Sequence, residues 1–438
     1  MICGEDILNP VGGRGVYLKL VSQKMASYAD IVIITPTAYG TREGFFICDE
    51  KESIRVPQED WKPEHGKFRV FKAFFYNDYP QLDDKTIMEF DGKKVAFEGH
   101  GRVMFEEFKA YYNFMLNFAS HMKKMEFDLI HVHDSDLWFL AQTLGIYYRV
   151  PIVYSSHLAE NLGPSKIYMS PHWRLCITRE AFALKDSIKI HTLSEDYKNK
   201  LVEVFPTIED KITVIPNAVN GKFLDSIKFD DELRKERLGN YKGIITLVGR
   251  LVPQKGIDFF LDAVRKFPDY KFILISVYSF THDTGTNEIA EYAKKTLDEC
   301  PNFEWENGYN QDLKWKIMKI SDVGVVPSRY GSYEIVVAEW MALKTPVIIS
   351  NKCPIIEYLP EDCCDIIDPS SESLIETLEN FEKSEDRIER AFEFAINNTW
   401  ETVAKKHVEM YEKVLGEKNG WIFYPTWDRC NVPGKSIR

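Results

Sequence analysis

The sequence predicts an α/β protein with two doubly wound parallel sheets. Nine short runs rich in β-branched and apolar residues recur along the chain, and segments with apolar residues at helical spacing lie between them. Strands that are apolar on both faces are typical of parallel sheets covered by helices on each side. A chain of 438 residues is also long for one domain, so two domains are expected.

The predicted elements alternate along the chain. The strands are residues 29–36, 128–133, 150–156, 189–194, 212–217, 243–249, 271–277, 322–328 and 345–350. Clear helical patterns occupy residues 17–28, 256–267 and 286–300.

One polar and charged stretch, residues 220–243, interrupts this alternation and contains no strand pattern. We therefore place the domain boundary near its beginning, with Rossmann-like domains at 1–220 and 221–399. Ligands of such folds bind at the carboxyl ends of the strands, so the expected site is the cleft between the two domains.

The composition limits the kinds of partner and the cellular compartment that we expect for this protein. The net charge of -12 argues against nucleic acid or an anionic membrane, because either partner requires a basic face. The eight cysteines contain no C-x-x-C pair, which is typical of reduced thiols in the cytoplasm. Neither a secretory signal nor a run of about 20 apolar residues is evident. We expect a cytoplasmic protein without an integral membrane segment, and its oligomeric state is left open.

The most informative local motif is "LVGRLVPQKGIDFF", in which Arg250 and Lys255 lie in the turn between a strand and a helix. Two cations beside a helix N-terminus favour a phosphate or diphosphate. The alternative is a solvated loop with two surface cations.

A second candidate is "NPVGGRGVYLKL", where Gly12 and Gly13 precede a helix. Glycines let backbone amides approach an anion closely. The motif matches neither of the common nucleotide-binding glycine patterns, and a plain strand-to-helix turn is the alternative.

Histidines end two neighbouring predicted strands. His133 closes "DLIHVH", and His157 follows "IVYSS". Ligands bind at such strand ends, although a structural role is equally compatible with the pattern. Asp134 and Asp136 form a D-x-D pair that holds a divalent metal in some glycosyltransferases, but we favour helix capping for Asp136.

Together and in order, these motifs resemble those of the retaining, nucleotide-sugar-dependent glycosyltransferases of the GT-B fold, a superfamily that includes the glycogen synthases. The segments that carry the resemblance are "VIPNAVNGKF" (214–223), "GRLVPQKGID" (249–258) and "VPSRYGSYEIVVAEWMALKTPVI" (326–348). The resemblance implies that a C-terminal helix and tail, residues 400–438, cross back to the first domain.

The resemblance also assigns roles. The second domain would bind the donor, with Arg250 and Lys255 at the diphosphate and the Gly12–Gly13 backbone assisting. Glu339 would accept the two ribose hydroxyls, and Tyr309 would stack on the base unless it is a surface turn residue.

In the first domain, the resemblance places His157 near the transferred sugar, and His133 and Asp134 are candidates on the acceptor side. Neither a metal ion nor a cofactor is required, because the cations stabilise the leaving diphosphate.

One departure from the family pattern concerns the sugar contact. Relatives have glutamate where this chain has Gly331, and glycine where it has Glu334. Either Glu334 reaches the sugar from a shifted loop, or the sugar contact is lost.

We expect a hexosyl transfer from a nucleotide diphosphate sugar, such as UDP-glucose or UDP-GlcNAc, to a hydroxyl of a sugar, glycan or small molecule. The alternative is a non-catalytic relative that binds a nucleotide sugar or glycan as a partner or scaffold. The sequence leaves the sugar, the base and the acceptor open.

Overall fold

The structure is a computed structural model that describes residues 1–3, 13–36, 68–73, 86–90, 93–97, 127–133, 135–157, 171–276, 286–308 and 310–416. The chain forms two compact units. Unit 1 comprises Met1–His191, Leu201–Thr213 and Lys405–Arg438, and unit 2 comprises Thr192–Lys200 and Val214–Ala404.

Residue 220, where we place the boundary from the sequence, lies inside unit 2. The main chain enters unit 2 earlier, at Val214, which is the last residue of a strand. The polar stretch that follows folds as two short helices on unit 2.

Unit 1 is built on a seven-stranded sheet with the order β3-β2-β1-β6-β7-β8-β9. Every neighbouring pair from β3 to β8 is parallel. The strands are β1 (Ile2–Cys3), β2 (Ile31–Pro36), β3 (Phe68–Ala73), β6 (Ile130–His133), β7 (Ile152–Ser155), β8 (Lys189–Thr192) and β9 (Ile212–Val214). An antiparallel hairpin, β4 (Thr86–Phe90) and β5 (Lys93–Phe97), is separate from this sheet.

Helices connect these strands. They are α1 (Gly13–Met25), α3 (Trp138–Tyr148), α4 (Pro171–Asp186), α5 (Glu195–Val204) and α14 (Trp400–Gly416), with 3-10 turns η2 (Ser135–Leu137) and η5 (Pro206–Lys211). The helix α14 begins in unit 2 and belongs to unit 1 from Lys405 onward. This confirms the predicted return of the C-terminal helix to the first domain.

Unit 2 is built on a six-stranded parallel sheet with the order β12-β11-β10-β13-β14-β15. The strands are β10 (Ile244–Val248), β11 (Lys271–Ser276), β12 (Phe303–Asn307), β13 (Val323–Val326), β14 (Val347–Ser350) and β15 (Asp365–Ile367). The helices are α6 (Gly221–Asp225), α7 (Asp231–Leu238), α8 (Ile257–Lys266), α9 (Thr286–Glu299), α10 (Gln311–Ile320), α11 (Ile335–Ala342), α12 (Ser371–Glu379) and α13 (Glu385–Asn397), with 3-10 turns η6 (Pro253–Lys255) and η7 (Pro354–Tyr358).

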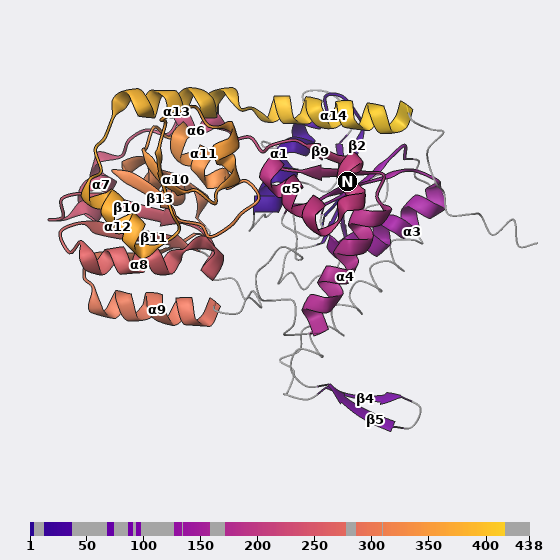
Figure 1. Ribbon diagram of the computed structural model, residues 1–438, viewed down its shortest axis with the longest axis horizontal. Helices are drawn as coiled ribbons and strands as arrows, with labels where there is room; N and C mark the ends of the chain where they lie inside the picture. The colour runs from indigo at the N-terminus through magenta and orange to yellow at the C-terminus, as the bar shows by residue number, and fades with distance from the viewer. Residues whose placement is uncertain are drawn as a thin grey trace, which may run out of the picture. The chain divides into compact units, whose positions relative to one another are not determined.

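Both faces of this second sheet are buried. Figure 1 shows α8 and α9 on one side of it and α11 and α13 on the other. Alternate residues of β10 serve the two sides: Ile245 and Leu247 pack with α8, whereas Ile244 packs with α10. This double burial explains the near-continuous apolar runs and confirms the predicted α/β class.

The strand orders define two topological switch points, which are the places in each sheet where the order of the strands reverses direction. In unit 2 the chain runs from β10 outward to β12 and then crosses to β13 on the other side of β10. In unit 1 the same change of direction falls between β1 and β6. Ligands of open α/β sheets bind at such a switch point, outside the carboxyl ends of the strands.

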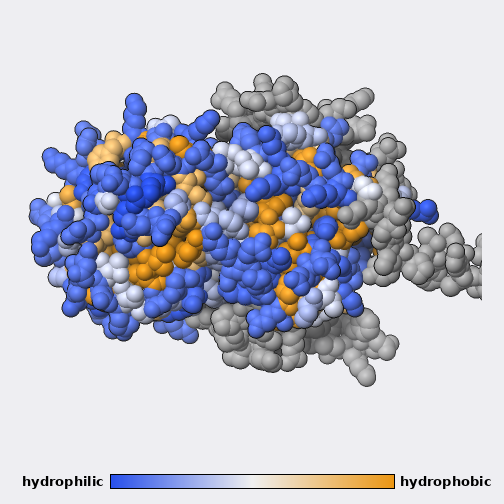
Figure 2. All heavy atoms as spheres, turned by 45° about the horizontal axis from the view of Figure 1, so that its top comes forward, coloured by the Kyte–Doolittle hydropathy of each residue, from blue (hydrophilic) through white to orange (hydrophobic). Residues whose placement is uncertain are grey.

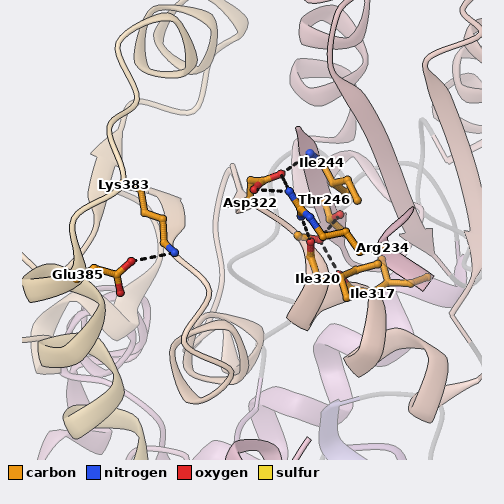
Figure 3. Close-up of polar contacts among 9 residues, drawn as sticks. Arg234, Ile244, Thr246, Ile317, Ile320, Asp322, Lys383 and Glu385 are labelled. Carbon is orange, nitrogen blue, oxygen red and sulfur yellow. Dashed lines mark hydrogen bonds and ion pairs between the residues drawn. The ribbon is translucent and has the colours of Figure 1, made fainter. Parts of the chain in front are cut away.

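At the amino ends of β10 and β13, one carboxylate joins the two strands. The Asp322 carboxylate accepts hydrogen bonds from the backbone N–H of Ile244, at 2.7 Å, and from the Arg234 guanidinium, at 2.9 and 3.0 Å. Arg234 also donates to the carbonyl of Ile320, and Figure 3 shows these contacts converging. The register of the two strands is therefore held at this end.

At the carboxyl ends of the same strands, Gly256 approaches the backbone of Pro327. Its φ is +64°, and a Cβ atom added there would lie 2.2 Å from the carbonyl oxygen of Pro327. Only glycine fits such a position, because L-residues rarely adopt this conformation and any side chain would collide with backbone. The loop after β10 is thus pressed against the loop after β13.

In unit 1, a cluster of buried histidines lies between the sheet and helices α1 and α14. The buried ring side chains are His131, His133, His157, His191 and His407, with Tyr17 packed among them. His131 bonds Tyr411 and also Ser155, at 2.7 Å.

Helix α14 supplies two members of this network. His407 bonds the hydroxyl of Tyr17, and Tyr411 bonds His131. Burial, followed by neighbouring histidines, lowers the pKa of His131, His133 and His407 well below the usual 6.5. Burial raises the pKa of Tyr411. These groups are therefore neutral in the folded protein at neutral pH.

Polar and charged residues cover most of the face drawn in Figure 2, and apolar residues appear there as separate areas. The most exposed large hydrophobic residues on described helices include Ile146 and Tyr147 of α3. In the described ranges, no helix combines the length and the apolar character that crossing a membrane requires.

The buried histidines predict acid sensitivity. Because their folded pKa lies below the unfolded value of 6.5, the unfolded chain binds protons more readily, and stability falls as the pH drops below about 6.5. We expect the melting temperature to fall between pH 7.5 and 5.5, measured by circular dichroism. His407→Gln, which cannot titrate here, should show a smaller fall; an equal fall in both proteins would contradict the prediction.

The contact at Gly256 predicts a large cost for one added methyl group. Gly256→Ala should lower the free energy of unfolding by at least about 3 kcal/mol, because both φ and the carbonyl of Pro327 oppose it. Gly239 has φ +56° and ψ -124° but no atom within 4 Å of an added Cβ, so in Gly239→Ala only the backbone conformation opposes the methyl group, at a cost of about 1–3 kcal/mol. Urea denaturation of the two variants tests the difference, and equal losses would disprove the close contact.

Candidate functional site

The candidate site in unit 2 lies at the switch point, where the loops after β10 and β13 meet. Lys255 ends the turn after β10, and its Nζ donates to both carboxylate oxygens of Glu334, at 2.8 and 2.7 Å. The side chains are 19 and 4% exposed. Such a two-oxygen ion pair, mostly out of water, holds both groups in one orientation.

Glu334 adopts a backbone conformation that normally requires glycine. It has φ 74° and ψ 66°, and it precedes the first residue of α11. A non-glycine residue in this region is uncommon and costs free energy. Lys255 bonds the carboxylate twice and so fixes the side chain of a residue with this uncommon backbone conformation.

Gly331 lies directly beside that carboxylate. A Cβ atom at residue 331 would be 2.4 Å from Oε1 of Glu334, so the Glu334 carboxylate fills the space that a side chain at 331 would occupy. Compared with the family pattern, glutamate and glycine are therefore exchanged between positions 331 and 334. The backbone at 334 nevertheless keeps a glycine-like conformation.

Further polar contacts join the two loops. The guanidinium of Arg329 bonds the carbonyl of Pro253 at 2.6 Å and the carboxylate of Asp258 at 2.8 and 2.5 Å. The backbone N–H of Arg329 donates to the carbonyl of Gln254 at 2.8 Å. Arg250, half-buried, follows the same strand as Lys255, so the fold places both predicted cations in one loop.

Glu339 lies in the second turn of α11, and its partner is Lys314 of α10. The Nζ of Lys314 is 3.2 and 3.1 Å from the two carboxylate oxygens of Glu339. Sequence reasoning missed Lys314. A signal was available, because Lys314 precedes Ile317 and Met318 by three and four residues and so shares their buried helix face.

The histidine candidates come together in unit 1. Nδ1 of His133 and Nε2 of His157 are 3.1 Å apart, and both rings are buried. They belong to the histidine cluster described above.

The structure gives less information about the remaining residues that the sequence predicts for the site. Gly13 is the first residue of α1, at the switch point of unit 1. Gly12, Asp134 and Tyr309 lie outside the described residues. The N-cap of α3 is Leu137, and the side chain of Asp136 lies outside the described part of the structure, so its capping role stays a prediction.

Within the described residues, neither a group of metal ligands nor the cavity found in unit 2 coincides with this site. Among the described residues, no group of three His, Cys, Asp or Glu side chains is arranged to hold a metal ion. A cavity of about 650 Å³ in unit 2 is lined by Tyr333, Tyr358 and Arg390, among others, and not by Lys255, Glu334 or Glu339.

Two family models match the chain. The model described as Glycosyltransferase Family 4 matches residues 73–222, and the model described as Glycosyl transferases group 1 matches residues 228–397. Together they include every described candidate residue except Gly13.

Individual relatives agree with this. An uncharacterized glycosyltransferase of Methanocaldococcus jannaschii is 27% identical over 54% of the chain and 61% of its own length. The Escherichia coli UDP-Gal:alpha-D-GlcNAc-diphosphoundecaprenol alpha-1,3-galactosyltransferase is 27% identical over 52% of the chain and 59% of its own length. The chain thus spans about three fifths of the length of these two curated relatives.

A solved structure matches over nearly the whole chain. The sucrose-phosphate synthase of Thermosynechococcus elongatus has a TM-score of 0.69 and 15% identity, covering 95% of this chain and 98% of its own. That likeness establishes the two-domain fold. With the two family models, it shows that the chain belongs to the GT-B glycosyltransferases.

Proposed function

We propose that this protein transfers a hexosyl unit from a nucleotide diphosphate sugar to a hydroxyl acceptor, with retention of the anomeric configuration. The observation that carries the proposal is the Lys255–Glu334 pair at the switch point of unit 2, which combines a cation for phosphate with a carboxylate for sugar hydroxyls. The E. coli relative is named for a UDP-galactose donor, and this supports a uridine nucleotide.

The positive charges of Arg250 and Lys255 suit a diphosphate leaving group. When the sugar–phosphate bond breaks, the sugar becomes oxocarbenium-like and the diphosphate gains negative charge. Arg250 and Lys255 would stabilise that charge without a metal ion. Lys255 has three N–H donors, and Glu334 takes two of them, which leaves one for a phosphate oxygen.

Retention follows from attack on the face that the diphosphate leaves. The acceptor oxygen would form its bond to the anomeric carbon while its proton passes to the departing phosphate oxygen. No carboxylate nucleophile is needed in this scheme. Glu334 would accept sugar hydroxyls, and Glu339 the ribose hydroxyls.

A second candidate is a non-catalytic protein that binds nucleotide sugars or glycans. The exchange of glutamate and glycine at 331 and 334 favours it, because the usual sugar contact has moved. Calorimetry separates the two candidates, since nucleotide binding without turnover supports only the second.

Incubation of the purified protein with UDP-, ADP- and GDP-sugars tests the proposed reaction. We expect release of a nucleoside diphosphate from one of them. Arg250→Ala and Lys255→Ala should each reduce the rate by about 10²-fold or more. Lys266→Ala, in an exposed position of α8, should leave it unchanged. A folded protein that hydrolyses and transfers from no donor would refute the enzyme assignment.

The reciprocal exchange predicts a rescue. Glu334→Gly should lower kcat/KM for the donor by about 10- to 100-fold, because a hydrogen-bonding carboxylate is lost. The double variant Gly331→Glu with Glu334→Gly returns the carboxylate from the neighbouring position and should recover at least about tenfold. Steady-state kinetics decides, and a double variant no better than Glu334→Gly would show that this carboxylate does not contact the sugar.

A further inference from the structure

Lys314 is a buried cation with no role assigned by the family pattern. Its side chain is 10% exposed and that of its partner Glu339 is 14% exposed. Removing two charges from water is costly unless they compensate each other. Since both oxygens of Glu339 bond the same ammonium, the pair is compensated and its geometry is fixed.

The surroundings of Lys314 further restrict the position of its ammonium group. Its Nζ is 5.0 Å from the centre of the Trp315 ring, and that ring packs edge-on against Phe223 at 5.0 Å. The start of α10 is held as well, because the side chain of Asn310 accepts from the N–H of Leu313 at 3.1 Å. The ammonium is therefore presented to Glu339 by a helix whose first turn is capped.

This arrangement leaves Glu339 able to accept two more hydrogen bonds. A carboxylate has about four lone-pair positions, two on each oxygen. Lys314 uses one on each oxygen, so each oxygen keeps one position for a hydroxyl. A 1,2-diol such as that of a ribose matches two acceptors held side by side on one carboxylate.

We propose that Lys314 is a positioning residue that acts through Glu339 and sets the preference for a ribonucleotide over a 2′-deoxyribonucleotide. The proposal rests on the proposed function, in which Glu339 accepts the ribose hydroxyls. Without the ammonium, the buried carboxylate loses both its compensating charge and its fixed orientation.

Calorimetry tests the proposal with wild type, Lys314→Met and Lys316→Met. The control residue Lys316 is on the same helix, but its side chain is 52% exposed and its Nζ is 4.0 Å from Asp230. The probes are UDP, ADP and GDP, followed by the 2′-deoxy form of the tightest. We expect wild type and Lys316→Met to prefer the ribonucleotide by about tenfold or more, and Lys314→Met to lose most of that ratio.

The ratio of the affinities for the ribonucleotide and for its 2′-deoxy form distinguishes a positioning role of Lys314 from a purely structural one. A Lys314→Met protein that binds both forms more weakly but keeps the ratio overturns the inference and leaves the proposed function standing. A wild type that binds a nucleoside diphosphate without preferring the ribose form also overturns it. A folded wild type that binds none of the three overturns the proposed function and the inference together.

Two additional variants keep the test decisive if Lys314→Met does not fold. Lys314→Gln removes the charge but keeps a donor, and it should also lose the ratio. Lys314→Arg keeps the charge and two donors on one fork, and it should retain the ratio. Loss of the ratio in Lys314→Arg but not in Lys314→Gln would contradict the proposal.

Discussion

The candidate site of unit 2 depends on one constraint, the close parallel pairing of β10 with β13. Asp322 and Arg234 hold the two strands at their amino ends, and the bare backbone of Gly256 meets Pro327 at their carboxyl ends. Because the register is held at both ends, the loops that follow start from set positions. The ion pair between Lys255 and Glu334, which are far apart in sequence, is a consequence of that pairing.

Much of the fold could be predicted because a parallel sheet covered on both faces needs strands that are apolar on both faces. Such strands are visible in the sequence as nearly continuous apolar runs. All nine expected strands overlap strands of the structure. Strand β12 was missed because its sequence, "FEWEN", alternates: Phe303 and Trp305 face the core, whereas Glu304 and Glu306 bond Arg237. It is an edge strand, and only one of its faces is apolar.

Motifs identified the loops of the site but not the partners of its side chains. Glu334 and Gly331 could be recognised as exchanged, yet only the structure shows that the carboxylate fills the space beside residue 331. Lys314 and Glu339 lie on different helices, so their pairing depends on packing and not on local spacing. The histidine cluster was likewise read as two strand-end residues, because His191 and His407 reach it from distant segments.

The division of α14 between the units has a consequence for biosynthesis. Unit 2 from Val214 to Ala404 is continuous in sequence, whereas unit 1 requires the chain from Lys405 onward. Domains generally fold in the order in which they leave the ribosome. Tyr17 and His131 of unit 1 bond side chains of α14, so the packing of unit 1 requires the chain from Lys405 onward. The segment that completes unit 1 is therefore synthesised only after all of unit 2.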